Sequence, residues 1–126
     1  MNIVTRALLI ATAMLLVLAP AAVADTNDND FVYAMEDKYN IHSVAGPADL
    51  IQAGHQVCGF LSPSTSPAMV TDYVNRASLY GGRFYTISLG GSHAPLTNSQ
   101  AGMLVTYAIG TYCPDSEGAR YWGMGR

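Results

Sequence analysis

The chain has 126 residues, half of them apolar, and its first 24 residues contribute 19 of the apolar side chains. The other 102 residues carry nine acidic and five basic side chains, a net charge of −4, and their length fits one globular domain. Because no lysine or arginine cluster is present, the composition argues against a protein that follows nucleic-acid phosphates. The sparse charge also argues against a disordered acidic tail.

Residues 1–24 have the three-part pattern of a secretory signal peptide. Arg6 supplies the positive charge, residues 7–18 form an apolar stretch, and Ala22-Val23-Ala24 is an A-x-A cleavage site. A membrane anchor is the alternative, but a stretch of twelve residues is shorter than the roughly 20 that cross a bilayer. We therefore expect cleavage between Ala24 and Asp25. The product is expected to be secreted or associated with the cell envelope, with no membrane span.

The segment after the cleavage site is polar, and we expect residues 25–29 to be a flexible leader. A short helix is predicted to begin near Asn29 or Asp30, because either side chain can cap it. The inward face of this helix is predicted to consist of Phe31, Met35 and Tyr39. Ile41 is expected to fold back onto the core.

Two further helices are predicted between residues 47 and 80. Pro47 occupies a favourable first helical position, and Ser62-Pro63 ends the helix that it begins. Ser66 and Pro67 supply the cap and the first residue of the next helix. The apolar face of the first of these helices is Leu50, Gly54, Val57 and Leu61, and that of the second is Val70, Val74 and Ala77.

The last predicted helix has the clearest beginning. Thr97 and Gln100 form a T-x-x-Q capping box, with Leu96 immediately before the cap. Apolar residues then follow a period of 3.6, namely Ala101, Leu104, Val105, Ala108, Ile109 and Tyr112. Pro114 closes the helix just after Cys113.

Two segments have weaker patterns. Residues 83–89 alternate as a strand does, but a lone strand has no partner, so we expect an ordered surface loop over residues 81–95. The glycine-rich tail of residues 115–126 is expected to be mobile, apart from docking by Tyr121 and Trp122.

The two cysteines of an exported chain normally form a disulfide. A bond between Cys58 and Cys113 would close a loop of 56 residues, which the chain-entropy model values at about 4 kcal/mol. One alternative is a redox-active pair, which usually has C-x-x-C spacing. Another is a metal site that includes His55, but no second ligand pair lies beside Cys113. We predict a structural disulfide and no metal.

Small residues accompany both cysteines along their helices. Gly54 precedes Cys58 by one turn, and a strip on the last helix consists of Gly102, Thr106, Gly110 and Cys113. A disulfide needs Cβ atoms about 4 Å apart, whereas leucine-lined helices pack at about 8–10 Å. We therefore interpret Gly54 and Gly110, which precede the two cysteines by four and three positions, as packing residues at a close helix crossing.

Several of these motifs together resemble the domain-of-unknown-function 732 family, which comprises small exported proteins of mycobacteria and their relatives. The matching segments are Asp30-Phe31, Gly54-His55-Gln56-Val57-Cys58, Ser66-Pro67, Leu96-Thr97, Gln100-Ala101 and Tyr112-Cys113-Pro114. The resemblance covers about residues 28–115. It implies a small helical fold with a Cys58–Cys113 bridge and a cell-envelope or extracellular location, but no activity. Residues 79–95 and the tail after Pro114 depart from the family pattern, so features particular to this protein are expected there.

No catalytic constellation is visible in the sequence. Nucleophilic catalysis needs a serine or cysteine with a histidine base, and no G-x-S-x-G motif is present. We interpret His55, the only histidine within a predicted helix, as a half-buried residue beside the disulfide. Aromatic residues around the long loop are candidate contacts for an apolar ligand or heme. With His55, the candidates are Tyr73, Tyr80, Phe84 and Tyr85; their alternative interpretation is as amphipathic residues at the edge of the core.

The sequence therefore predicts a mainly α fold, a small bundle of three or four short helices pinned by one disulfide, in a helical domain of residues 30–114. Our first hypothesis is a non-enzymatic interaction module without a cofactor, which contacts an envelope or extracellular protein or a glycan. The second is a carrier of a small apolar ligand or heme. An enzyme is the third, and the missing acid–base constellation disfavours it.

Overall fold

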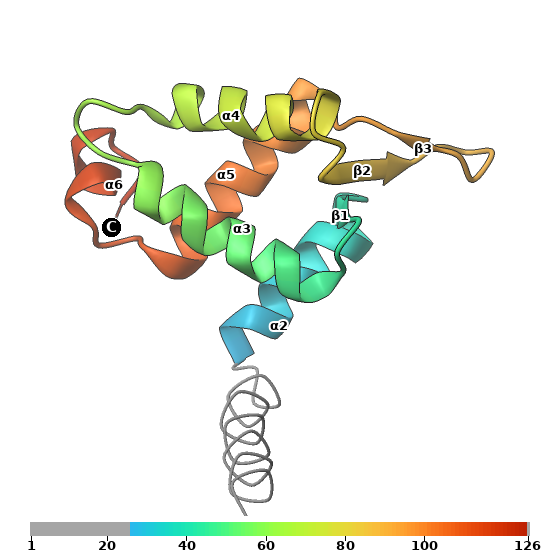
Figure 1. Cartoon of the computed structure of the whole chain (residues 1–126). Helices are drawn as coiled ribbons and strands as arrows, with labels where there is room; N and C mark the ends of the chain where they lie inside the picture. Colours follow the sequence, from blue (N-terminus) through green and yellow to red (C-terminus); the bar gives the residue numbers. More distant parts are fainter. Residues whose placement is uncertain (1–25, 126) are drawn as a thin grey trace, which may run out of the picture.

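Helix α5 (Asn98–Tyr112) is the element around which the other helices pack. In the computed structural model, which describes residues 26–125, α3 (Pro47–Phe60) and α4 (Pro67–Leu79) make their most extensive contacts with α5. Helix α2 (Thr26–Tyr33) packs against both α3 and α5, and Figure 1 shows it at the opposite side of α3 from α4. The prediction of a mainly α bundle is confirmed.

The three longest helices begin where their capping residues predicted. In α5 the capping box is complete, because the Gln100 backbone N donates to Thr97 Oγ1 (3.1 Å) and the Thr97 backbone N donates to Gln100 Oε1 (3.0 Å). In α4 the Ser66 hydroxyl accepts from the Met69 backbone N (3.2 Å). Helix α3 begins after Gly46, whose φ of +93° favours glycine.

The first helix begins earlier than expected. Residues 26–29, predicted to be a flexible leader, form the first turn of α2. A long-range contact explains the difference, because the Tyr112 hydroxyl donates to Asp28 Oδ1 (2.6 Å) and ties this turn to α5. The predicted signal peptide and its cleavage site at Ala24 and Asp25 lie outside the described residues.

Helix α2 continues into a wider π-helical turn, η1 (Ala34–Lys38). The chain then reverses at Asn40, which adopts a φ of +56°. This reversal returns Ile41 to the core, where it is completely buried as expected.

A three-stranded antiparallel sheet replaces the surface loop expected over residues 81–95. Strand β2 (Phe84–Ile87) lies between β1 (His42–Ser43) and β3 (His93–Ala94), with His42 opposite Tyr85 and Thr86 opposite Ala94. The alternation of residues 83–89 did indicate a strand. Its partners were missed because each is only two residues long, too short to show a period.

The tail, which was expected to be mobile, contains a short helix. Ser116 caps α6 (Glu117–Tyr121), and Ala119 is completely buried. The Trp122 indole N–H donates to the Ser62 carbonyl (2.8 Å), which confirms the predicted docking of this ring. Gly118 allows α6 to pack closely against Leu61. A Cβ at this position would lie 2.9 Å from the Leu61 carbonyl oxygen, so only glycine permits this contact.

The core joins all the helices described so far to β2. Its completely or nearly completely buried large side chains are Phe31, Met35, Ile41, Leu50, Val70, Leu104, Val105 and Ile109. The predicted disulfide is confirmed: Cys58 of α3 is bonded to Cys113 at the end of α5, with the Cα atoms 6.0 Å apart. None of the described helices has the length and apolar character needed to cross a membrane.

Only one of the glycines near the disulfide is a packing residue. A Cβ on Gly54 would lie 2.7 Å from Tyr112 Cε2 and 2.9 Å from Phe31 Cε1, so the two rings occupy the space of its missing side chain. A Cβ on Gly110 would meet nothing within 4 Å, and the packing role assigned to this glycine was therefore wrong. The physical reason lies at Cys113, whose φ of −147° and ψ of 44° are not helical, so the strip does not continue to it at 100° per residue.

Candidate functional site

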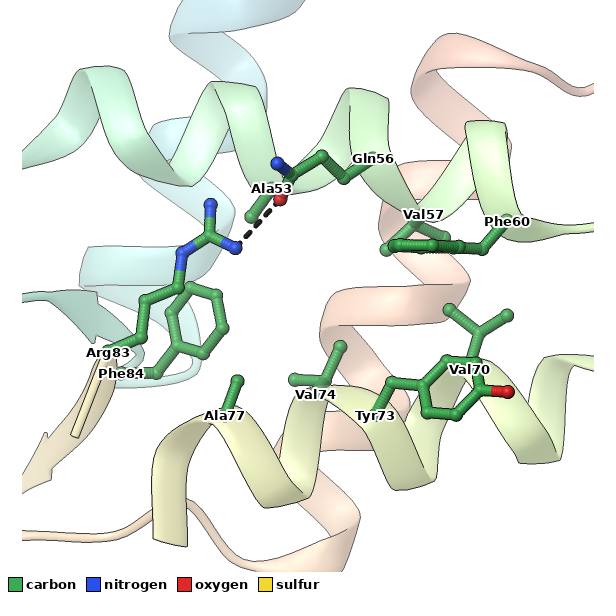
Figure 2. A pocket seen from close by; sticks show the side chains of 10 residues that line it. All are labelled: Ala53, Gln56, Val57, Phe60, Val70, Tyr73, Val74, Ala77, Arg83 and Phe84. Atoms are coloured by element: carbon green, nitrogen blue, oxygen red, sulfur yellow. Dashed lines mark hydrogen bonds between the residues drawn. The ribbon is translucent and has the colours of Figure 1, made fainter. Parts of the chain in front are cut away.

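An apolar groove lies between α3 and α4 and has a volume of about 260 Å³ (Figure 2). Its lining comes from three segments. Helix α3 contributes Ala53, Gln56, Val57 and Phe60; helix α4 contributes Val70, Tyr73, Val74 and Ala77; and the start of the β2 segment contributes Arg83 and Phe84. We refer to these ten residues as the α3–α4 groove.

Small side chains create the space at one end of the groove. Ala53 and Ala77 face one another from α3 and α4, beside the Phe84 ring (Figure 2). Ala53 and Phe84 are almost completely buried, as are Val57 and Val70 further along. These side chains belong to the hydrophobic core, so the walls of the groove are held in place by the packing that stabilises the fold.

The other end of the groove is aromatic. Phe60 and Tyr73 meet edge to face with ring centroids 5.8 Å apart. Phe60 is 55% exposed and Tyr73 is 44% exposed, although both contribute to the lining. Two large rings held open to solvent beside an apolar hollow are typical of a contact surface.

The positively charged side chain of Arg83 lies at the end of the groove that contains Ala53 and Ala77. The Arg83 guanidinium donates to both carboxylate oxygens of Asp49 (2.9 and 3.0 Å) and to Gln56 Oε1 (2.7 Å). It also lies 5.0 Å from the centroid of the Phe84 ring. These bonds use three of its five N–H groups, so two N–H groups are not engaged by Asp49 or Gln56.

The Arg83–Asp49 ion pair is extended by Ser43, whose hydroxyl also donates a hydrogen bond to Asp49. The Arg83 hydrogen bonds hold the pKa of Asp49 below its ordinary value, and a hydrogen bond from the Ser43 hydroxyl (2.6 Å) acts in the same direction. Asp49 belongs to the first turn of α3 and Ser43 to β1, so these interactions fix the groove's charged end to two elements.

The structure places two of the five predicted contact residues in the groove. Tyr73 and Phe84 line it. Tyr80 caps the end of α4 and is 81% exposed, while Tyr85 stacks between His42 (5.2 Å) and His93 (3.9 Å). His55 is exposed and lies against the Tyr112 ring at 4.1 Å, away from the groove. Its expected half-burial beside the disulfide is therefore corrected to an exposed ring contact.

The lining residues that the sequence reasoning missed are Ala53, Gln56, Phe60 and Arg83. Phe60 follows Val57 by three positions and therefore lies near the apolar face of α3, which was a usable signal. No signal in the sequence indicated Arg83 or Gln56, because their hydrogen bond joins positions 27 residues apart and depends on the tertiary fold.

The groove offers no histidine, cysteine, aspartate or glutamate side chain to a metal or a heme iron. Across residues 26–125, no group of three or more such side chains is placed to hold a metal ion. What the groove offers instead is apolar surface, two exposed rings and one partly engaged guanidinium.

Comparisons with known proteins give one match. A family model described as a protein of unknown function (DUF732) matches residues 27–115, a range that includes the whole groove. The searches of curated proteins and of solved structures found no match.

Proposed function

The chain belongs to the DUF732 family, whose function is unknown, and from that premise we propose that it is a secreted or cell-envelope-associated, non-catalytic interaction module that binds a partner protein through the α3–α4 groove. The observation that carries this proposal is the pair of exposed rings, Phe60 and Tyr73, at an apolar hollow whose walls are core side chains. Aromatic residues next to such hollows are the side chains that most often dominate protein interfaces.

The volume of the groove is sufficient for one or two apolar side chains of a partner protein. Sites that enclose drug-sized ligands have volumes of about 300–1,000 Å³. The groove has about 260 Å³, which suits one or two apolar side chains projecting from a partner's surface. The two remaining N–H groups of Arg83 would meet a carbonyl or carboxylate oxygen of the same partner.

Export is supported by the signal-peptide pattern of residues 1–24 and by the Cys58–Cys113 disulfide, because disulfides persist mainly in oxidising compartments. The test is N-terminal sequencing of the protein recovered outside the cytoplasm. We expect it to begin at Asp25. Retention of Met1 in that fraction would contradict a cleaved signal.

A groove-filling substitution tests the binding surface. Peptides selected from a random display library on the wild-type protein are expected to carry apolar or aromatic residues. Ala77→Leu places a larger side chain in the groove, so it should weaken their binding by about tenfold or more, equivalent to about 1.4 kcal/mol. Ala68→Leu makes the same change at an exposed position of the same helix and serves as the control. Equal binding to all three proteins would contradict the proposal.

A carrier of a small apolar ligand is the second candidate function, and the nearly continuous apolar wall of the groove is the observation that favours it. Native mass spectrometry of the protein purified from its own host distinguishes the two. A carrier would retain a lipid or other apolar molecule, and a heme carrier would show a Soret band. An interaction module would show the mass of the polypeptide alone.

A further inference from the structure

Two tyrosines and a lysine meet where η1 ends against α5, and none of the three lines the α3–α4 groove. The Tyr107 hydroxyl oxygen accepts hydrogen bonds from the Lys38 ammonium (3.2 Å) and from the Tyr39 hydroxyl (3.4 Å). The two rings contact one another edge to face, with centroids 5.3 Å apart. Within residues 26–125, no other two tyrosines are in ring contact.

The surroundings favour loss of a proton from one ring of this pair. The hydrogen bonds donated by Tyr39 and Lys38 lower the pKa of Tyr107. The ammonium also lies 5.4 Å from the Tyr39 ring centroid and 5.8 Å from the Tyr107 ring centroid. A phenolate gives up an electron more readily than a phenol does, so Tyr107 is the member of the pair that a one-electron oxidant would attack first.

The ring of Tyr107 can be reached from solvent. It borders an open surface hollow whose other residues are Thr106, Gly110 and Thr111 of α5. Gly110 leaves the hollow unfilled, because nothing lies within 4 Å of the position that its Cβ would take. The edge of the Tyr107 ring is therefore open to an external oxidant without any movement of the backbone.

We propose that Tyr39 and Tyr107 form a site of intramolecular oxidative cross-linking, at which a heme peroxidase with hydrogen peroxide joins them as dityrosine. Each phenol loses one electron and one proton to become a phenoxyl radical. The two radicals couple through ring carbons next to the hydroxyls, and the hydrogens on those carbons move to the oxygens to restore both phenols. The protein loses two hydrogen atoms in all, and one hydrogen peroxide is reduced to two water molecules.

The bond would tie the end of η1 to α5 and close a loop between residues 39 and 107. Like a disulfide, it would constrain the unfolded chain. Unlike the Cys58–Cys113 disulfide, the dityrosine bond would resist reducing agents. It would therefore add an irreversible cross-link to a reversible one. This inference is independent of the proposed partner-binding function, because the two sites share no residue.

The test is treatment of the purified, disulfide-bonded protein with a heme peroxidase and hydrogen peroxide. We expect monomer that has lost two hydrogen atoms, dityrosine fluorescence in that monomer, and a cross-linked peptide containing residues 39 and 107. Tyr107→Phe and Tyr39→Phe should each abolish this product while preserving the far-UV circular dichroism spectrum. Tyr80→Phe, at an 81% exposed position, is the matched control and should leave it unchanged.

Lys38→Met separates an activating role of the ammonium from simple proximity of the rings. At neutral pH we expect this variant to cross-link more slowly than the wild type. At a pH above 10.0, the ordinary tyrosine pKa, Tyr107 ionises without the Lys38 ammonium, and the two proteins should cross-link at the same rate. An unchanged neutral rate would refute the role of Lys38. Dityrosine found only between chains, or persisting in the Tyr107→Phe monomer, would refute the site itself.

Discussion

The space beside Gly54 is filled by the rings of Phe31 and Tyr112, whereas the space beside Gly110 is open. Tyr112 has little freedom to move aside, because its hydroxyl donates to Asp28 and its ring lies against His55. Gly54 thus lies in the interior of α3 with its surroundings filled, and Gly110 lies in the last turn of α5 with its surroundings open.

Gly54→Ala and Gly110→Ala are expected to differ in stability by the cost of overpacking. Both substitutions gain up to about 1 kcal/mol of helix propensity. Only Gly54→Ala forces two rings to shift, at about 1–3 kcal/mol. Urea unfolding should therefore show Gly110→Ala to be the more stable variant by that difference. Equal free energies of unfolding would mean that the rings beside Gly54 yield freely.

Ser78 is a buried polar residue that joins three segments. Its hydroxyl donates to the Phe84 carbonyl (2.9 Å) and accepts from the Leu96 backbone N (2.8 Å). Ser78→Ala leaves both buried backbone groups without this partner, so we expect a loss of about 1–3 kcal/mol in the free energy of unfolding. Ser99→Ala, exposed in the first turn of α5, should change it by less than about 0.5 kcal/mol. A loss at Ser78 no larger than at Ser99 would contradict this role.

At the scale of elements, local chemistry made the helices predictable and non-local pairing hid the sheet. Thr97 with Gln100, and Ser66 with Met69, begin their helices through hydrogen bonds within four residues, so the sequence alone contains the signal. The strand over Phe84–Ile87 needs partners about 40 residues before it and a few residues after it. Helix α6 likewise depends on a close approach of Gly118 to Leu61, which no local pattern records.

The ion pair between Arg83, which immediately precedes β2, and Asp49 of α3 should be sensitive to acid. The pKa of Asp49 is lowered in the folded protein, so its pairing stabilises the fold at a pH above the ordinary value of 3.8. That contribution should be lost as the pH falls below 3.8 and through the lowered folded value. Arg83→Met removes the main cause of the shift, so this variant should lose about 1–3 kcal/mol at neutral pH and show a weaker acid dependence.

Arg76→Met is the control for this prediction. Arg76 also pairs with an aspartate, Asp72, at 3.0 Å, but both side chains are more than half exposed. An exposed pair of this kind contributes about 0–1 kcal/mol, so the variant should resemble the wild type at neutral pH. Matching effects of Arg76→Met and Arg83→Met would contradict a special role for the partly buried Arg83–Asp49 pair.

At the scale of the whole molecule, the disulfide is the longest-range covalent constraint in the described chain. It closes a loop of 56 residues, so we expect the Cys58→Ser/Cys113→Ser double variant to lose about 4 kcal/mol of stability. This is a large share of the net stability of about 5–15 kcal/mol that is typical of a domain. Helical far-UV circular dichroism should nevertheless remain at low temperature. Stoichiometric thiol labelling of denatured, unreduced wild-type protein would show that the bond is absent.

The candidate site was predictable only in part, for a reason that belongs to the whole fold. Tyr73 and Phe84 were identified as aromatic contacts because aromatic residues gather around the segment after α4. The groove itself exists because α3 and α4 both rest on α5 with Ala53 and Ala77 facing one another (Figure 2). That arrangement, and the pairing of Arg83 with Gln56, follow from helix packing and not from any spacing along the chain.

We infer that the α3–α4 groove is a preformed surface for apolar side chains. The most direct test is methyl-resolved NMR of the wild-type protein titrated with isobutyl alcohol and 4-methylphenol, which mimic leucine and tyrosine side chains. We predict saturable shift changes concentrated on the methyl groups of Val57, Val70 and Val74, which line the groove, and their loss in Ala77→Leu. Changes scattered over the surface, or centred on the hollow beside Tyr107, would contradict this inference.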